Sequence, residues 1–329
     1  MKKIVNDPSN IVDEMLQGMI IGHSELIQRI PETGIIQRKS AKSGKVAIIS
    51  GGGSGHEPAH AGFVGEGMLS AAVCGAVFTS PTPDQILEAI KVANEGAGVF
   101  MVIKNYSGDI MNFEMAQELA EMEGIEVASV VVDDDIAVED SLYTQGKRGV
   151  AGTILVHKII GYAAQQGKSI TEIKALADNL MPNIKSIGLA LTGVTTPGSA
   201  QPSFVLAEDE IEYGVGIHGE PGYRREKLQT SYNLAKELLT KLVNEFDAKA
   251  TDRFAVIVNG LGGTPLMEQY VFTNDVHQLM DERKLSVDYY KIGNYMTSLE
   301  MQGLSLTLLH LENDFYIEAL NAPVTTISW

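Results

Sequence analysis

The chain has 329 residues, of which 44% are apolar, 42 are acidic and 25 are basic, so its formal net charge at pH 7 is −17. This acidic excess argues against nucleic acid or a membrane as partner, because nucleic acids and anionic membranes attract clustered Lys and Arg. The length predicts two domains. A single cysteine, Cys74, and the absence of a signal peptide or a long apolar run predict a cytoplasmic protein.

The first half of the chain alternates strands and helices. Asp7 followed by Pro8 is a helix-start signal, and apolar residues then share one helical face up to Met19. Apolar runs predict strands at 46–50, 71–78, 99–103 and 127–132, with helices at about 86–93, 110–122, 150–165 and 170–181. Because strand, polar loop and helix repeat in this order, an α/β domain is expected, with right-handed crossovers and a mostly parallel sheet flanked by helices.

The pattern changes after Pro182 and Asn183, where we place the boundary between domains 1–183 and 184–329. Strands are expected at 187–191, 203–206 and 211–217, and the turns between them are too short for crossover helices. A helix at 231–246, a strand at 254–258, a glycine turn at 260–263, helical signals to about 283, and strands at 287–291 and 304–311 follow. The second domain is therefore predicted as α/β or α+β with a mixed sheet.

The segment KVAIISGGGSGHEP, residues 45–58, runs from a predicted buried strand into glycines and then His56. Glycines leave backbone amides accessible, and open α/β sheets bind ligands at the carboxyl ends of their strands. The segment is not a phosphate-binding P-loop, since no lysine follows the glycines. It also fails the dinucleotide pattern, because His56 stands where the last glycine should be. A small-ligand site and a plain glycine turn with an incidental histidine both remain open.

Two other segments carry candidate polar groups. Lys104 and Asp109 follow the third predicted strand, and His218 lies between glycines in GVGIHGEPG, residues 214–222. The structural alternatives are a solvated charge for Lys104 and a helix N-cap for Asp109.

Further polar residues have a structural interpretation as the first choice. The acidic run 133–135 is either a solvated loop or a Mg²⁺ site, since hard cations prefer carboxylate oxygens. His60, close to the glycines, is a weak candidate for the site. The remaining histidines, expected to be structural or on the surface, are His23, His157, His277 and His310.

Several long motifs favour the functional interpretation of these residues. They are SGGGSGHEP (50–58), FTSPTPD (78–84), IKNYSGDIMNFE (103–114), VVDDDIAVEDSLYTQGKRGVAGT (131–153), GVGIHGEPG (214–222), NGLGGTPLMEQY (259–270) and YMTSLEMQGLSLTLL (295–309). Together, and in this order, they resemble the dihydroxyacetone-binding subunit of dihydroxyacetone kinase over the whole chain.

The resemblance implies a covalent mechanism. A ring nitrogen of His218 attacks the carbonyl carbon of dihydroxyacetone to give a hemiaminal, and His56 and Asp109 assist proton transfer from the hydroxyl that accepts phosphate. We expect an imidazole of ordinary pKa at His56, or Asp109, to accept that proton. Glycerol lacks a carbonyl, so the covalent step itself supplies specificity. The implied substrate-binding residues are Gly53, Ser54, Gly55, His56, Lys104, Asp109 and His218.

The same resemblance predicts what the chain associates with. Phosphoryl transfer needs a nucleotide and Mg²⁺, and nothing in the sequence indicates an ATP site. We therefore expect no cofactor or metal in this chain, and ADP or ATP with Mg²⁺ on a separate kinase subunit. That subunit would be loaded by a phosphocarrier of the phosphoenolpyruvate-dependent phosphotransferase system, and the chain is expected to form a homodimer. A dihydroxyacetone-sensing paralogue that activates a transcription regulator is the main alternative, and a stand-alone ATP kinase is a weaker one.

Overall fold

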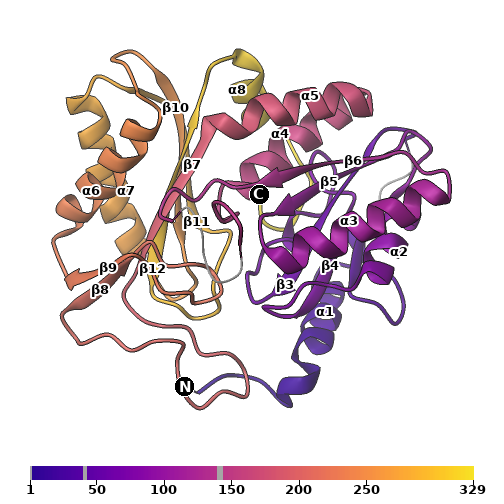
Figure 1. Cartoon of the computed structure of the whole chain (residues 1–329), viewed down its shortest axis with the longest axis horizontal. Helices are drawn as coiled ribbons and strands as arrows, with labels where there is room; N and C mark the ends of the chain where they lie inside the picture. Colours follow the sequence, from indigo (N-terminus) through magenta and orange to yellow (C-terminus); the bar gives the residue numbers. More distant parts are fainter. Residues whose placement is uncertain (1, 40–42, 139–143) are drawn as a thin grey trace.

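The computed structural model describes residues 2–39, 43–138 and 144–329, which form two six-stranded sheets with helices between and outside them (Figure 1). The first sheet has the order β1-β2-β4-β3-β5-β6. Its strands are β1 (Ile27–Arg29), β2 (Ile35–Arg38), β3 (Ala47–Ser54), β4 (Ala71–Val77), β5 (Val99–Lys104) and β6 (Val127–Val132). The four strands from β4 to β6 are parallel, as predicted, and the short antiparallel edge of β1 and β2 was not predicted.

The second sheet has the order β11-β10-β12-β7-β8-β9 and is mixed, as predicted, because only β10 and β11 are parallel. Its strands are β7 (Ile184–Ala190), β8 (Glu210–Tyr213), β9 (Arg224–Lys227), β10 (Arg253–Gly260), β11 (Ser286–Asn294) and β12 (Gly303–His310). Two expectations were wrong. Residues 203–206 form no strand, and the strand expected at 211–217 ends at Tyr213, which leaves His218 in a loop.

The helices form three layers around the two sheets (Figure 1). They are α1 (Ile11–Gly22), α2 (Pro83–Ala93), α3 (Ser107–Met122), α4 (Thr153–Gln165), α5 (Ile170–Leu180), α6 (Ser231–Glu245), α7 (Leu266–Glu282) and α8 (Asp314–Asn321). Helices α2 and α3 cover the outer face of the first sheet, and α6 and α7 cover the outer face of the second. Helices α4, α5 and α8 lie between the sheets, where α4 is buried on all sides from Thr153 to Ala164, including His157 and Lys158.

The region between the sheets is one continuous apolar core to which both contribute, for example Phe100 from β5 and Ile257 from β10. The predicted boundary at 183/184 falls just before β7 and separates the strands of the two sheets. Residues near each end of the chain contact the other half of the chain. Lys3 pairs with Glu300, and near the other end the backbone N–H of Thr325 donates to the carbonyl of Glu66. No helix in the described parts of the chain combines the length and apolarity needed to cross a bilayer.

Candidate active site

The glycine run is part of strand β3 and not, as expected, a loop after it. The chain needs glycine here because its neighbours approach too closely for a side chain. A Cβ at Gly53 would lie 2.5 Å from the backbone nitrogen of Thr79. A Cβ at Gly52, whose φ is 149°, would lie 2.5 Å from Nζ of Lys104. The strand thus admits a buried lysine beside it and places His56 just beyond its carboxyl end.

Two histidines from different sheets meet at this point. His218, in the loop between β8 and β9, has its Nε2 3.1 Å from Nε2 of His56, although 162 residues separate them in sequence. The ring of Phe78 stacks on His56 with centroids 5.1 Å apart, and Tyr106 meets His218 edge-on at 4.4 Å. Aromatic rings therefore hold both imidazoles in fixed orientations.

A cavity of about 520 Å³ opens beside the histidine pair. Its lining residues are Gly53, Phe78, Thr79, Ser80, Tyr106, Ser107, Gly108, Asp109, Asn112 and His218. Three of the predicted site residues, Gly53, Asp109 and His218, therefore share one cavity, and His56 contacts His218 directly.

Lys104 and Asp109 form a buried ion pair. Lys104 Nζ donates to Oδ2 of Asp109 at 3.2 Å, and the two side chains are 0% and 5% exposed. Both structural alternatives were wrong. Lys104 is not solvated, and Tyr106 holds the N-cap position of α3, which places Asp109 in the first helical turn. A carboxylate at this position also interacts favourably with the helix dipole.

Ser54 and Gly55 lie next to the site with their polar groups already engaged. The Ser54 hydroxyl donates to the carbonyl of Gly75 at 2.7 Å. The Gly55 N–H donates to the two carboxylate oxygens of Glu57 at 3.0 and 3.1 Å. Neither residue lines the cavity, and their roles as substrate ligands stay predictions.

The protonation behaviour of His56 differs from the expectation. Burial lowers the pKa of its imidazole well below the ordinary value, and the nearby His218 and Lys104 act in the same direction. The expected ordinary pKa was therefore wrong, because a sequence does not show that His56 is fully buried. A positive charge confined to the His56 ring is disfavoured.

Two residues of the site, Glu220 and Arg148, were not predicted from the sequence. Glu220 accepts the backbone N–H of His218 at 2.9 Å with Oε2, and its Oε1 lies 3.4 Å from Nδ1 of His218. Burial alone would raise the pKa of the Glu220 carboxyl, but its contact with His218 and the charge on Arg148 hold that pKa below the ordinary value. Arg148 pairs with Asp135 at 2.7 Å and donates to the carbonyl of Gly214 at 2.7 Å, which anchors the His218 loop. The sequence signal that could have indicated Glu220 is its position two residues after His218.

The acidic run at 133–135 is mostly structural. Asp134 accepts two backbone N–H groups and the Ser186 hydroxyl, and burial raises its pKa to about 6. The solvated-loop interpretation is wrong for Asp134 and Asp135, which are 0% and 2% exposed. Their oxygens face protein donors, and within 2–39, 43–138 and 144–329 no three His, Cys, Asp or Glu side chains are grouped to hold a metal ion. Residues 139–143 of the motif at 131–153 lie outside the described residues.

His60 does not line the cavity. Its Nδ1 lies 2.9 Å from Nε2 of His157 in the apolar interior, and both rings are buried. Burial lowers the pKa of His157 to about 3, which fits the structural role expected for it.

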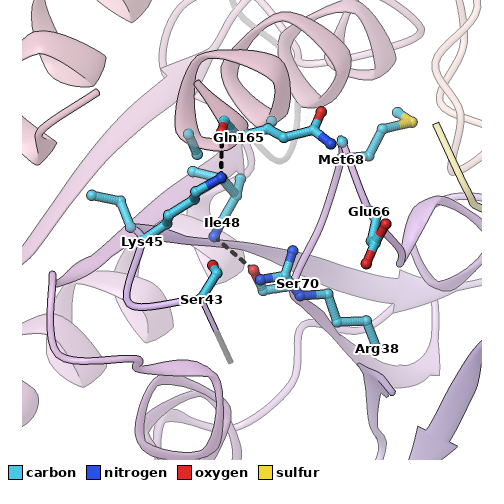
Figure 2. Close-up of a pocket in the computed structure, with 12 residues that line it drawn as sticks. Arg38, Ser43, Lys45, Ile48, Glu66, Met68, Ser70 and Gln165 are labelled. Carbon is cyan, nitrogen blue, oxygen red and sulfur yellow. Dashed lines mark hydrogen bonds between the residues drawn. The ribbon is translucent and has the colours of Figure 1, made fainter. Parts of the chain in front are cut away.

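A second cavity, of about 140 Å³, lies between the first sheet and the end of α4 (Figure 2). Its two cationic side chains are engaged, Arg38 with Glu95 and Lys45 with the carbonyl of Gln165. It contains no histidine or cysteine, whereas His218 lines the first cavity.

Comparisons with known proteins identify the family of the chain. The Dak1 domain model matches residues 17–328. A Lactococcus lactis protein named PTS-dependent dihydroxyacetone kinase, dihydroxyacetone-binding subunit DhaK, is 63% identical over 100% of this chain and 99% of its own. The DhaKLM operon coactivator DhaQ of the same organism is 47% identical over 99% of this chain and 100% of its own.

A solved structure extends the comparison. The dihydroxyacetone kinase of C. freundii in complex with AMP-PNP and Mg²⁺ superposes with a TM-score of 0.92 at 36% identity, covering 100% of this chain but 60% of that one. The family match over nearly the whole length, together with these identities, shows that the chain belongs to the Dak1 domain family.

Proposed function

We propose that this protein is the dihydroxyacetone-binding subunit of a phosphoenolpyruvate-dependent dihydroxyacetone kinase, and that it holds its substrate as a hemiaminal on His218. The observation that carries the proposal is the 3.1 Å approach of His56 and His218 at a cavity that Asp109 also lines. The name of the Lactococcus lactis relative, which is 63% identical, supports the same substrate.

The site geometry supports a division of roles. His218 Nε2 attacks the ketone carbon, while Glu220 holds the ring through Nδ1. The adduct fixes the hydroxymethyl group in the cavity, and Asp109 there is placed to accept the hydroxyl proton as phosphate arrives. Lys104 balances the charge on Asp109. Gly53, Ser54 and Gly55 complete the proposed substrate site.

The phosphoryl donor is assigned to a partner. We infer that ADP or ATP with Mg²⁺ binds a separate kinase subunit, loaded by a phosphocarrier of the phosphotransferase system. The Lactococcus lactis relative, which this chain covers to 99% of its length, is named as the dihydroxyacetone-binding subunit of a PTS-dependent kinase, and this name supports the inference. Helix α3, which begins at the cavity rim, exposes large apolar side chains at Met111, Met115, Leu119 and Met122, as surfaces that contact proteins do. A homodimer in the cytoplasm remains part of the proposal.

Reconstitution tests this function. Mixed with a nucleotide-loaded kinase subunit, the phosphocarrier proteins and phosphoenolpyruvate, the chain is expected to yield dihydroxyacetone phosphate. The main alternative function is a dihydroxyacetone-sensing paralogue, and the 47% identity to an operon coactivator favours it. Formation of the adduct without any dihydroxyacetone phosphate would identify a dihydroxyacetone sensor. Binding of ATP to the isolated chain would instead support the alternative of a stand-alone ATP kinase.

Substitution of Gly216 by alanine is expected to weaken dihydroxyacetone binding. Its Cβ would lie 2.0 Å from Oε2 of Glu220 and 2.7 Å from Nη1 of Arg148, so the carboxylate must leave His218. Loss of a charged hydrogen bond costs about 1.5–3 kcal/mol, or about ten- to a hundredfold in affinity. Titration calorimetry measures the change. Gly18→Ala is the control, because no atom lies within 4 Å of the Cβ it adds, and an unchanged affinity in Gly216→Ala would contradict the role of Glu220.

A further inference from the structure

The hydrogen-bond partners of the two histidines determine how many protons they carry. His56 Nδ1 lies 2.7 Å from the backbone carbonyl of Thr297, which can only accept, so this nitrogen carries a proton. His218 Nδ1 faces the carboxylate of Glu220, another acceptor, and therefore carries a proton as well. If both rings were neutral, each Nε2 would have only a lone pair, and the two lone pairs would face each other at 3.1 Å.

We propose that the ligand-free pair holds one excess proton, shared between Nε2 of His56 and Nε2 of His218, and that Glu220 carries the balancing negative charge. The distance between the two nitrogens is that of a hydrogen bond and not of a repulsive contact. The proton belongs to the pair as a coupled unit, and its position is not fixed to one ring.

The surrounding charges favour Glu220 as the counter-ion. The titratable and charged groups that face the pair are Glu220, Arg148, Tyr106, Asp109 and Lys104. Arg148 has its own carboxylate in Asp135, and Lys104 has its own in Asp109. Burial raises the pKa of the Tyr106 hydroxyl well above its ordinary value, so that group stays neutral. Glu220, 4% exposed and in contact with His218, is left to balance the charge of the pair.

The shared proton has a use in the adduct chemistry, and this step rests on the proposed function. During the attack the proton shifts toward His56 Nε2, which frees a lone pair on His218 Nε2 without leaving a separate positive charge on the His56 ring. A bond then forms between this nitrogen and the ketone carbon, the C=O π bond breaks, and the oxygen takes the proton from His56. The positive charge now resides on the substituted His218 ring, still opposite Glu220. The site therefore has the same net charge before and after adduct formation.

The protonation of the ligand-free pair can be measured without substrate. In protein with ¹⁵N-labelled histidine, we expect three N–H protons on the two rings near neutral pH and a through-hydrogen-bond ¹⁵N–¹⁵N coupling between the two Nε2 atoms. The chain has 7 histidines, and the coupling itself identifies the pair. Two N–H protons and no coupling would overturn the proposal, while the proposed kinase function would still stand.

The Glu220→Gln variant tests the counter-charge, because it keeps the size of the side chain and an acceptor oxygen. We expect the pH midpoint for loss of the shared proton to fall by about one to three units, since an opposite charge in contact stabilises the protonated form. Glu212→Gln is the matched control. It removes a carboxylate that is 3% exposed and accepts the N–H of Gly222, but does not contact His218. Equal midpoints in the wild type and Glu220→Gln would overturn the role of Glu220.

Calorimetry with dihydroxyacetone measures how proton uptake and affinity depend on pH. Below the midpoint, adduct formation should take up no proton. Above it, one proton should be taken up, and affinity should fall about tenfold per pH unit. In Glu220→Gln, this fall should begin at lower pH. Affinity that stays constant through the alkaline range in the wild type would contradict the shared proton.

Discussion

Replacing His218 with alanine is expected to abolish the covalent adduct with dihydroxyacetone and to lower phosphoryl transfer by at least about a thousandfold, because positioning by a covalent bond is worth effective molarities far above any substrate concentration. No other imidazole takes its place, since the His56 ring is fully buried and does not line the cavity. Intact-protein mass spectrometry measures the adduct, after rapid desalting and without prior reduction by borohydride.

The matched control for that experiment is His277→Ala. The His277 side chain is 59% exposed and interacts with Asp281 and Tyr290, far in sequence from every residue of the site. This variant should keep both the adduct and turnover. An adduct that persists in His218→Ala would remove His218 from its role, and loss in both variants would point to a general effect on the protein.

Replacing Lys104 with methionine is expected to destabilise the fold by about 3–5 kcal/mol, because it leaves the carboxylate of Asp109 buried without a partner. Both side chains of the pair are almost completely inaccessible, at 0% and 5% exposure, so water does not replace the lost partner. The free energy of unfolding from urea titration measures the effect. The same variant should lose turnover, since the Asp109 carboxylate loses the ammonium group that holds it in position.

A double variant separates stability from catalysis. Lys104→Met combined with Asp109→Leu removes both charges, and replacing a whole buried pair by apolar residues is often nearly neutral. We expect the double variant to recover most of the lost stability and none of the turnover. An unfolding free energy unchanged by Lys104→Met alone would show that the pair is hydrated, and recovery of turnover in the double variant would exclude Asp109 as the proton acceptor.

The pattern of elements was largely predictable from the sequence. Fully apolar runs such as 99–103 form parallel strands because both faces of the sheet are covered, and β5 occupies this position. Errors arose where local chemistry is ambiguous. The glycines at 51–53 suggested a loop but belong to strand β3, where Val73 approaches Gly51, Lys104 approaches Gly52 and Thr79 approaches Gly53 too closely for side chains. Residues 203–206 have a strand-like pattern but no partner strand to pair with.

The sequence by itself determined the composition of the site: a histidine after a glycine-rich strand, a lysine and an aspartate after a second strand, and a histidine between glycines in the other half of the chain. Only the tertiary structure decided that His56 and His218 touch, that Lys104 is buried against Asp109, and that Glu220 holds the second histidine. The physical reason is that periodicity reports which face of an element is buried, whereas contacts and pKa values depend on distances between segments far apart in the chain. Those distances are set by how the two sheets pack across their shared core.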